Sequence, residues 1–236
     1  MIGFGYHPEI VRRFPEVCGG VILVQGALNS PSPDNLKEAF FSEQRAVKDR
    51  IGATPLSELE SLSAWRGVFR TFGVDPTKYR SAAEALLRRL VKKGDIPSIN
   101  SLVDICNLIS IRYALPVAAF DAQHLSGVIT VCFADGSEEF LAHDQDEIEH
   151  TERGEVIFCD ETGLVFARRW CWKQSRQSVV TDKTHLAVIT IEAQHSGARQ
   201  SIDRALNELY ELTQRNLGGT YQRGVVGMDQ MEIRSE

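Results

Sequence analysis

Residues 79–121, YRSAAEALLRRLVKKGDIPSINSLVDICNLISIRYALPVAAFD, predict two helices joined by a proline-bearing turn, followed by a strand. The first helix covers residues 81–93 and ends at Gly94, because glycine readily adopts the left-handed conformation that closes a helix. The second helix covers residues 101–112 and carries apolar side chains along one side. Pro116 then begins an extended segment, since proline and the residue before it disfavour a continued helix. This order of elements is the strongest indication of fold in the chain.

The sequence on either side adds helices before this stretch and strands after it. Segments of β-branched and aromatic residues between glycines or acidic turns predict strands, and apolar residues at helical spacing predict helices. The expected strands are 18–26, 127–133, 155–160, 163–168 and 186–191, and the further helices are 33–50, 56–71 and 199–217. We therefore expect one α+β domain over residues 1–236, with an N-terminal strand and helical layer at 1–64, a core at 65–217 and a C-terminal tail at 218–236.

Composition excludes several classes of protein and limits the kinds of partner that the chain can bind. No segment reaches the roughly 18 apolar residues of a membrane span, and the first residues lack the apolar core of a signal peptide, so we expect a cytoplasmic protein without a membrane partner. The five cysteines form no CxxC pair and are expected as free thiols. A net charge of −6 disfavours a broad nucleic-acid footprint, so any RNA contact would be local and no DNA contact is expected.

Two basic clusters are candidates for such a local contact, and each has an alternative interpretation as a solvated surface. On a helix, Arg80, Glu84 and Arg88 share one face, so an internal ion pair is an equally simple explanation of the charges there. The first cluster comprises Lys78, Arg80, Arg88, Arg89, Lys92 and Lys93, and the second comprises Arg168, Arg169, Lys173 and Arg176.

The sequence contains none of the common motifs of nucleotide, phosphate or zinc-hydrolase chemistry. It lacks a GxGxxG fingerprint with its acidic partner, a GxxxxGK[ST] loop, an HExxH pair and a GxSxG elbow. His143 and His150 lie in an acidic stretch that is more typical of a solvated loop than of a metal site. We expect no metal and no cofactor.

Three other positions combine unusual residues with a strand or helix. Glu192 directly follows the apolar run 186–191. A carboxylate there must be solvated, paired with another group or part of a functional site, because burying it unpaired is costly. Trp170 and Trp172, at positions i and i+2 of an expected extended segment, would face the same side, as a surface for stacking on a base or as a hydrophobic lid. Asn107 lies inside the helix 101–112, where asparagine usually donates a hydrogen bond that orders a neighbouring loop.

In order and spacing, these pieces resemble the tRNA-editing domain of the phenylalanyl-tRNA synthetase beta subunit, in its free-standing form. The resemblance extends from about residue 65 to residue 193. The segments that carry it are 98–107 (SINSLVDICN), 115–121 (LPVAAFD), 154–160 (GEVIFCD), 167–175 (ARRWCWKQS) and 189–193 (ITIEA).

The resemblance implies an α+β fold with a mixed β-sandwich of unusual topology and helices packed outside it. It also implies a pocket that receives the aminoacylated 3′ end of a tRNA and hydrolyses a wrong amino acid from it, without any aminoacylation activity. A glutamate at the position of Glu192 would then recognise the side chain of the misattached amino acid. The family pattern has threonine at Cys106 and histidine at Ala118, so the identity of that amino acid stays open.

On this basis we predict roles for twelve residues. Glu192 and Asn107 are the expected catalytic residues, the first holding a polar group of the amino acid and the second ordering the pocket wall. The expected substrate-binding residues are Cys106, Ala118, Asp121, Trp170 and Trp172, and the expected RNA-binding residues are Arg88, Arg89, Arg168, Arg169 and Lys173. Two alternatives remain: a non-catalytic RNA-binding module of the same fold, and a hydrolase of small acyl compounds.

Overall fold

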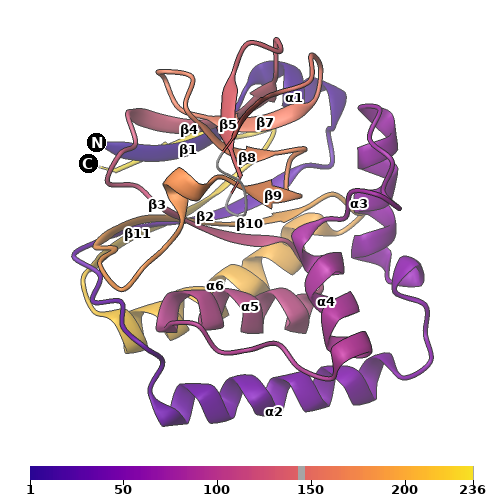
Figure 1. The fold of residues 1–236 in the computed structure, drawn as a ribbon, viewed down its shortest axis with the longest axis vertical. Coiled ribbons are helices and arrows are strands. Elements are labelled where there is room, and N and C mark those ends of the chain that lie inside the picture. Colours follow the sequence, from indigo (N-terminus) through magenta and orange to yellow (C-terminus); the bar gives the residue numbers. More distant parts are fainter. Residues whose placement is uncertain (143–146, 236) are drawn as a thin grey trace.

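Two β-sheets face each other in the computed structural model, which describes residues 1–142 and 147–235 (Figure 1). The six-stranded sheet has the order β12 (Glu232–Arg234), β1 (Ile2–Tyr6), β4 (Gly127–Phe133), β7 (Val156–Cys159), β8 (Val165–Arg168) and β9 (Lys173–Gln174). The four-stranded sheet has the order β11 (Thr220–Val226), β2 (Cys18–Gln25), β10 (Leu186–Ala193) and β3 (Val117–Asp121). Strands β1 and β4 are parallel, whereas the other neighbours are antiparallel. A separate pair, β5 (Glu139–Leu141) and β6 (Ile148–His150), lies beside β8.

Alternation along β10 divides its side chains between two cores. Val188 packs between the sheets, while Ile189 and Ile191 pack against the helices on the other face. Successive side chains of a strand point to opposite faces, so Glu192 lies on the same face as Val188, toward the six-stranded sheet. The strand is buried on both faces, as its continuous apolar sequence predicted.

Helices cover the outer face of the four-stranded sheet, as Figure 1 shows. This layer contains α2 (Asp34–Ile51), α4 (Ala82–Lys93), α5 (Ser101–Tyr113) and α6 (Ala198–Leu217). Two further helices, α1 (Pro8–Arg13) and α3 (Glu60–Thr71), contribute instead to the core between the sheets. The α+β sandwich with helices outside is thus confirmed.

The stretch that decides the fold forms as predicted, for local reasons. The Ser81 hydroxyl accepts a hydrogen bond from the Glu84 amide at the start of α4, and Gly94 closes that helix at φ 89°. Asn100 caps α5 in the same way by accepting from the Val103 amide. The expected helix 56–71 is interrupted, because Leu59 is extended between a 3₁₀ turn (Leu56–Glu58) and α3.

Strand pairing at the two chain ends was not predicted. The N-terminal residues form β1, and the predicted tail 218–236 supplies β11 and β12. Strands β1 and β12 pair antiparallel, so the two ends of the chain lie side by side in Figure 1. Strand β12 has only three residues, too few for an alternating pattern to identify it from the sequence.

In the described part of the chain, no helix is long and apolar enough to cross a membrane. All five cysteines carry free thiols.

Asp104, on α5, anchors the helical layer. Its buried carboxylate accepts hydrogen bonds from the Ser32 hydroxyl (2.6 Å), the Ile99 amide (2.8 Å) and the Ser98 hydroxyl. Helix α2 begins without a side-chain cap, and the Ser32 hydroxyl just before it instead ties the entry of this helix to α5.

Replacing Asp104 with alanine should destabilise the protein by about 3 kcal/mol, because three buried or partly buried donors lose a charged acceptor. Urea unfolding measures the difference. Asp95→Ala, at an exposed position, is the matched control and should change stability by no more than about 0.5 kcal/mol. Equal effects of the two substitutions would refute the anchoring role.

Candidate functional site

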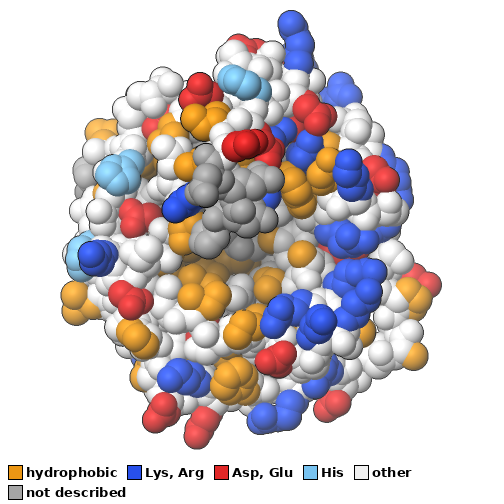
Figure 2. All heavy atoms as spheres, in the orientation of Figure 1, with side chains coloured by type: hydrophobic (Ala, Val, Ile, Leu, Met, Phe, Trp, Pro, Cys, Tyr) orange, Lys and Arg blue, Asp and Glu red, His pale blue; other side chains and the backbone are white. Residues whose placement is uncertain are grey.

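A cavity of about 480 Å³ lies between α5, the end of β10 and the turn that follows β8. Figure 2 shows a hollow near the middle of the molecule as viewed there, with hydrophobic side chains below it and Lys and Arg side chains to its right. The walls are mainly apolar and include Ile99, Val103, Phe120, Phe158, Ala167 and Val180. A concave, mostly apolar site with a few polar groups is the usual form of a small-ligand site.

Glu192 supplies the main polar group of this cavity. The residue is only 2% exposed, and its Oε1 accepts hydrogen bonds from the Tyr6 hydroxyl (2.7 Å) and the Trp170 Nε1 (2.9 Å). No described residue donates a hydrogen bond to Oε2. One oxygen therefore fixes the orientation of the carboxyl group, and the other remains available to a ligand.

The Tyr6 hydroxyl can reach Glu192 because residue 19, on the neighbouring strand β2, is a glycine and has no side chain. Gly19 on β2 pairs with Glu192 on β10. A Cβ at position 19 would lie 2.4 Å from the Tyr6 hydroxyl oxygen, which is closer than real atoms approach. Glycine at this position therefore makes room for the Tyr6 ring.

Burial raises the pKa of Glu192 to about 7. Loss of hydration favours the neutral acid, while the hydrogen bonds from Trp170 and Tyr6 favour the carboxylate and offset part of this effect. No described lysine or arginine forms an ion pair with it. Near neutral pH the group is therefore present in both protonation states.

Trp170 occupies its position through a strained turn. Arg169 and Trp170 adopt positive φ values of 46° and 61°, a conformation that costs non-glycine residues of order 1 kcal/mol or more. The Trp170 indole is completely buried against Trp65 and Phe14, with ring centroids 5.3 and 5.1 Å away.

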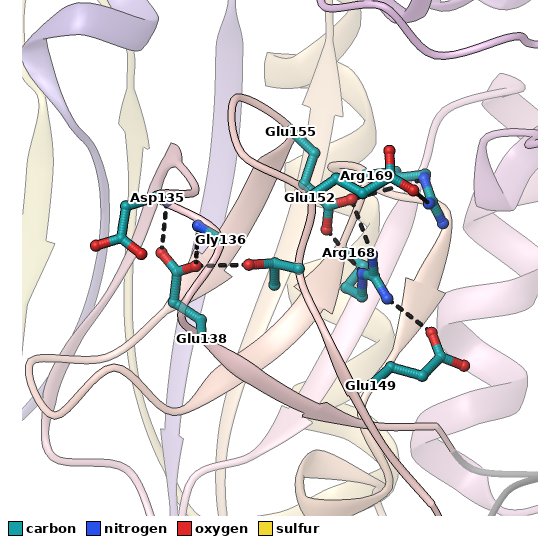
Figure 3. Close-up of polar contacts among 9 residues, drawn as sticks. Asp135, Gly136, Glu138, Glu149, Glu152, Glu155, Arg168 and Arg169 are labelled. Carbon is teal, nitrogen blue, oxygen red and sulfur yellow. Dashed lines mark hydrogen bonds and ion pairs between the residues drawn. The ribbon is translucent and has the colours of Figure 1, made fainter.

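A buried ion-pair network stabilises the two residues before this indole (Figure 3). Arg168 Nε and Nη2 donate to the two carboxylate oxygens of Glu155 at 2.7 and 3.1 Å, and its Nη1 donates to Glu149 at 2.7 Å. Arg169 donates to Glu152 at 2.7 Å. The network thus fixes the backbone on one side of the turn, and the aromatic cluster fixes the other.

This geometry corrects the prediction that Arg168 and Arg169 contact RNA. Both residues are nearly buried, at 2% and 5% exposed. Their guanidinium groups pair with glutamates of this chain, namely the buried Glu155, the partly exposed Glu149 and the exposed Glu152, which balance the charge that a phosphate would otherwise neutralise. Sequence could not distinguish the two cases because Glu149, Glu152 and Glu155 lie on a separate segment.

The expected extended segment at Trp170 and Trp172 is also wrong, because residues 169–172 form a turn. Trp170 enters the core, whereas Trp172 is half-buried and packs edge-on against Tyr79 at 4.8 Å. Both residues still border the cavity, together with Lys173, whose ammonium lies 5.6 Å from the Trp172 ring.

Helix α5 and strand β3 supply the opposite wall, with Cys106, Asn107 and Ala118 all lining the cavity. Burial raises the pKa of Cys106 to about 12, so its thiol does not ionise near neutral pH. Asn107 was expected to bond a neighbouring loop, but no described residue bonds its side-chain amide. That amide is available to a ligand.

Asp121 is not part of the cavity. It lies at the far end of β3 and accepts hydrogen bonds from the Thr184 hydroxyl and the Gln123 amide. Its carboxylate closes a turn, so its predicted role in substrate binding is not supported by its position.

Arg88 and Arg89 lie outside the cavity but close to it. They belong to a second hollow on α4 whose lining includes Trp172, which also borders the cavity.

Sequence reasoning missed Tyr6, Gly19 and Thr190. Tyr6 and Gly19 lie some 170 residues or more before Glu192, and no local pattern connects them. Alternation along β10 was the available signal for Thr190, since it places this residue on the face of Glu192.

Among residues 1–142 and 147–235, no three His, Cys, Asp or Glu side chains converge as a metal site. Of the two histidines discussed above, His143 lies outside the described residues, and His150 is exposed on β6.

Comparison with known proteins identifies relatives of this chain. The sequence model of the B3/4 domain family matches residues 64–215. The phenylalanine–tRNA ligase beta subunit of Brucella abortus (strain 2308) is 29% identical over 138 residues, which are 58% of this chain and 16% of that protein. The same subunit of Rickettsia conorii (strain ATCC VR-613 / Malish 7) is 39% identical over 64 residues, or 26% of this chain and 8% of that protein. The chain thus matches only a small part of these relatives.

Among solved structures, an N-terminal fragment of the phenylalanyl-tRNA synthetase beta subunit from Pyrococcus horikoshii aligns with a TM-score of 0.44 at 12% identity. The alignment covers 98% of this chain and 53% of that one.

Replacing Arg168 with methionine should destabilise the protein by about 3–5 kcal/mol, because Glu155 would remain buried without its main partner. Thermal or urea unfolding measures this loss. Removing both charges, in Arg168→Met/Glu155→Leu, should recover most of the stability. A double variant no more stable than the single variant would contradict the assignment of the cost to an unpaired charge.

Glu192 should make stability depend on pH. Its pKa of about 7 in the folded protein lies above the ordinary value of 4.5, so between these pH values the folded state binds a proton that the unfolded chain does not. The contribution of Glu192 to the free energy of unfolding is fully present below about pH 4.5. It is lost as the pH rises through about 7, by about 3 kcal/mol in total.

The measurement is urea unfolding of the wild type and Glu192→Gln from about pH 5 to about pH 8. The difference between the two proteins isolates this carboxyl group from the others. Parallel pH profiles would show that Glu192 titrates normally.

Proposed function

The chain belongs to the B3/4 domain family, and from this membership and its cavity we propose that it hydrolyses the ester of mischarged aminoacyl-tRNA. The amino acid would enter the cavity and the 3′-terminal ribose would remain at its mouth. The matched relatives are beta subunits of a tRNA ligase, which supports a tRNA-linked substrate. This is trans-editing-type deacylation at the tRNA 3′ end, without amino-acid activation.

One observation carries the proposal: a buried carboxyl group with one unoccupied oxygen faces an apolar cavity of about 480 Å³. An amino acid presents a polar group on a mainly apolar body, and the cavity is complementary to both. Glu192 Oε2 would bind the α-ammonium or a side-chain hydroxyl. With a pKa of about 7, its carboxylate form can accept a hydrogen bond from either group, and its neutral form can donate one to a hydroxyl oxygen but not to an ammonium.

The reaction demands little of the protein beyond positioning. An aminoacyl ester is an activated acyl group, and orienting one water against its carbonyl carbon supplies a large part of the rate, up to about 7–11 kcal/mol in the best cases. Asn107, which lines the cavity and whose side-chain amide bonds no described residue, would hold that water or the ester itself.

Covalent catalysis by Cys106 is not part of this mechanism. Burial holds the pKa of its thiol at about 12, and no described histidine contacts it. Cys106 and Ala118 instead limit the size of the cavity, where the family pattern has the larger threonine and histidine.

Those two departures favour a second candidate, a non-catalytic module that binds the same RNA. Such a module would bind tRNA with an affinity that falls steeply with salt, and would turn over no charged tRNA.

The deciding experiment follows loss of the ester from a panel of mischarged tRNAs. Wild-type protein should deacylate at least one, and Glu192→Ala should be slower by about 10–100-fold, the effect of one buried hydrogen bond to substrate. Glu38→Ala, at an exposed position on α2, is the matched control.

Two outcomes contradict the proposal. Turnover of no charged tRNA would favour the binding module, and equal rates for Glu192→Ala and Glu38→Ala would remove Glu192 from the mechanism. Cys106→Ala separates the chemical alternatives, since it should retain turnover within about tenfold, whereas loss of a covalent nucleophile reduces rates by orders of magnitude more.

A further inference from the structure

A second hollow of about 400 Å³ lies against the exposed side of α4, next to the cavity. We call it the α4 hollow. Among the described residues, its lining contains no acidic side chain, although the chain as a whole carries a net charge of −6. The residues that line it are Lys78, Arg80, Ala85, Arg88, Arg89, Lys92, Lys93 and Trp172.

Helix geometry gathers these cations. Residues four apart share a face, which places Arg88 beside Lys92 and Arg89 beside Lys93, while Leu87 packs in the core. Like charges at this spacing destabilise a helix by a few tenths of a kcal/mol per pair. An arrangement that costs stability in the free protein is understandable if a bound anion offsets the repulsion.

The one acidic residue of α4 itself, Glu84, is already engaged. Glu84 accepts from Arg66 at 2.7 Å and lies 3.7 Å from Arg80 Nε, within a largely buried pair. No described carboxylate pairs with Arg88, Arg89, Lys92 or Lys93. These four side chains are exposed and their charge is directed to solvent.

Trp172 connects the α4 hollow to the cavity. Its indole borders both, and it is fixed by the Tyr79 ring at 4.8 Å and by the Arg169 guanidinium 4.8 Å from its own centroid. Figure 2 shows the Lys and Arg side chains beside the hollow of the cavity on the same face. A ligand held in the cavity that extends past Trp172 therefore meets the cations of α4.

We infer that the α4 hollow binds the phosphates of a single-stranded RNA end whose terminal acyl group lies in the cavity. Arg88, Arg89, Lys92 and Lys93 neutralise the backbone, and the Trp172 indole offers a face for a terminal base. This inference deepens the proposed function and rests on it for the identity of the acyl group. It assigns phosphate binding to α4, in place of the buried Arg168 and Arg169.

RNA accounts for the site better than an acidic peptide does. A peptide could neutralise the same cations, but it would use neither the half-buried Trp172 indole nor the continuity with the adjoining cavity of about 480 Å³. A nucleotide chain uses all three features, since phosphate, base and acyl group follow one another along it.

The test is fluorescence anisotropy with a short 5′-labelled single-stranded oligoribonucleotide that carries no amino acid. Arg88→Gln/Arg89→Gln should bind about tenfold more weakly than wild type at about 0.05 M salt. Its slope of log affinity against log salt should be shallower by about 1.4, or about 0.7 for each lost phosphate contact. Lys92→Gln/Lys93→Gln removes the same charge from the next turn and should behave alike.

The matched control is Arg45→Gln/Arg215→Gln, which removes two exposed helical arginines from α2 and α6. Its affinity should stay within about twofold of wild type. Equal losses in the control and the α4 variants would overturn the inference, because the effect would then reflect net charge alone. Displacement of the RNA by polyglutamate of equal charge, at equal concentration, would also overturn it.

The inference and the proposed function can fail separately. Because the oligoribonucleotide bears no ester, its binding does not require hydrolysis. Binding that depends on α4 without turnover of charged tRNA would refute the deacylase and retain the RNA site. Turnover of charged tRNA with RNA binding indifferent to α4 would do the reverse.

Discussion

The site depends on one buried carboxyl group held between two sheets. Glu192 ends a strand of the four-stranded sheet, Tyr6 comes from the six-stranded sheet, and Trp170 comes from the turn after β8. Both donors bind the same oxygen, so the group is oriented without being saturated. An unpaired carboxylate at this depth would be costly, and the two hydrogen bonds together with a raised pKa keep that cost tolerable.

Trp170 can serve this carboxyl group only because other interactions hold an unfavourable backbone. Two successive non-glycine residues have positive φ, and the Arg168–Glu155 pair fixes the chain just before them. Buried ion pairs often add little net stability. Here the pair has a geometric consequence, since it determines where the indole nitrogen points. Arg168 and Arg169, two of the residues that sequence reasoning assigned to RNA, thus support the turn that carries Trp170.

Two neighbouring hollows of opposite character make up the proposed binding face. In the described part of the chain, the cavity is mainly apolar and one acid, Glu192, lines it, while the α4 hollow is lined by cations and no acid. Trp172 forms a wall of both. A ligand with an amino acid at one end and phosphates beyond it matches this order of environments.

The sequence by itself determined the helices of residues 79–121, the strands of both sheets with an apolar pattern, and the family resemblance that singled out Glu192. These depend on caps, periodicity and composition, which are properties of neighbouring residues. Only the tertiary structure decided that Tyr6 and Gly19 complete the site, that β11 pairs with β2 and β12 with β1, and that Asp121 lies outside the cavity. It also placed Arg168 and Arg169 inside, while Arg88 and Arg89 remained in solvent. In the sequence, both pairs are adjacent arginines of equal charge. What distinguishes them is whether glutamates from another segment of the chain pack against them, which no local pattern encodes.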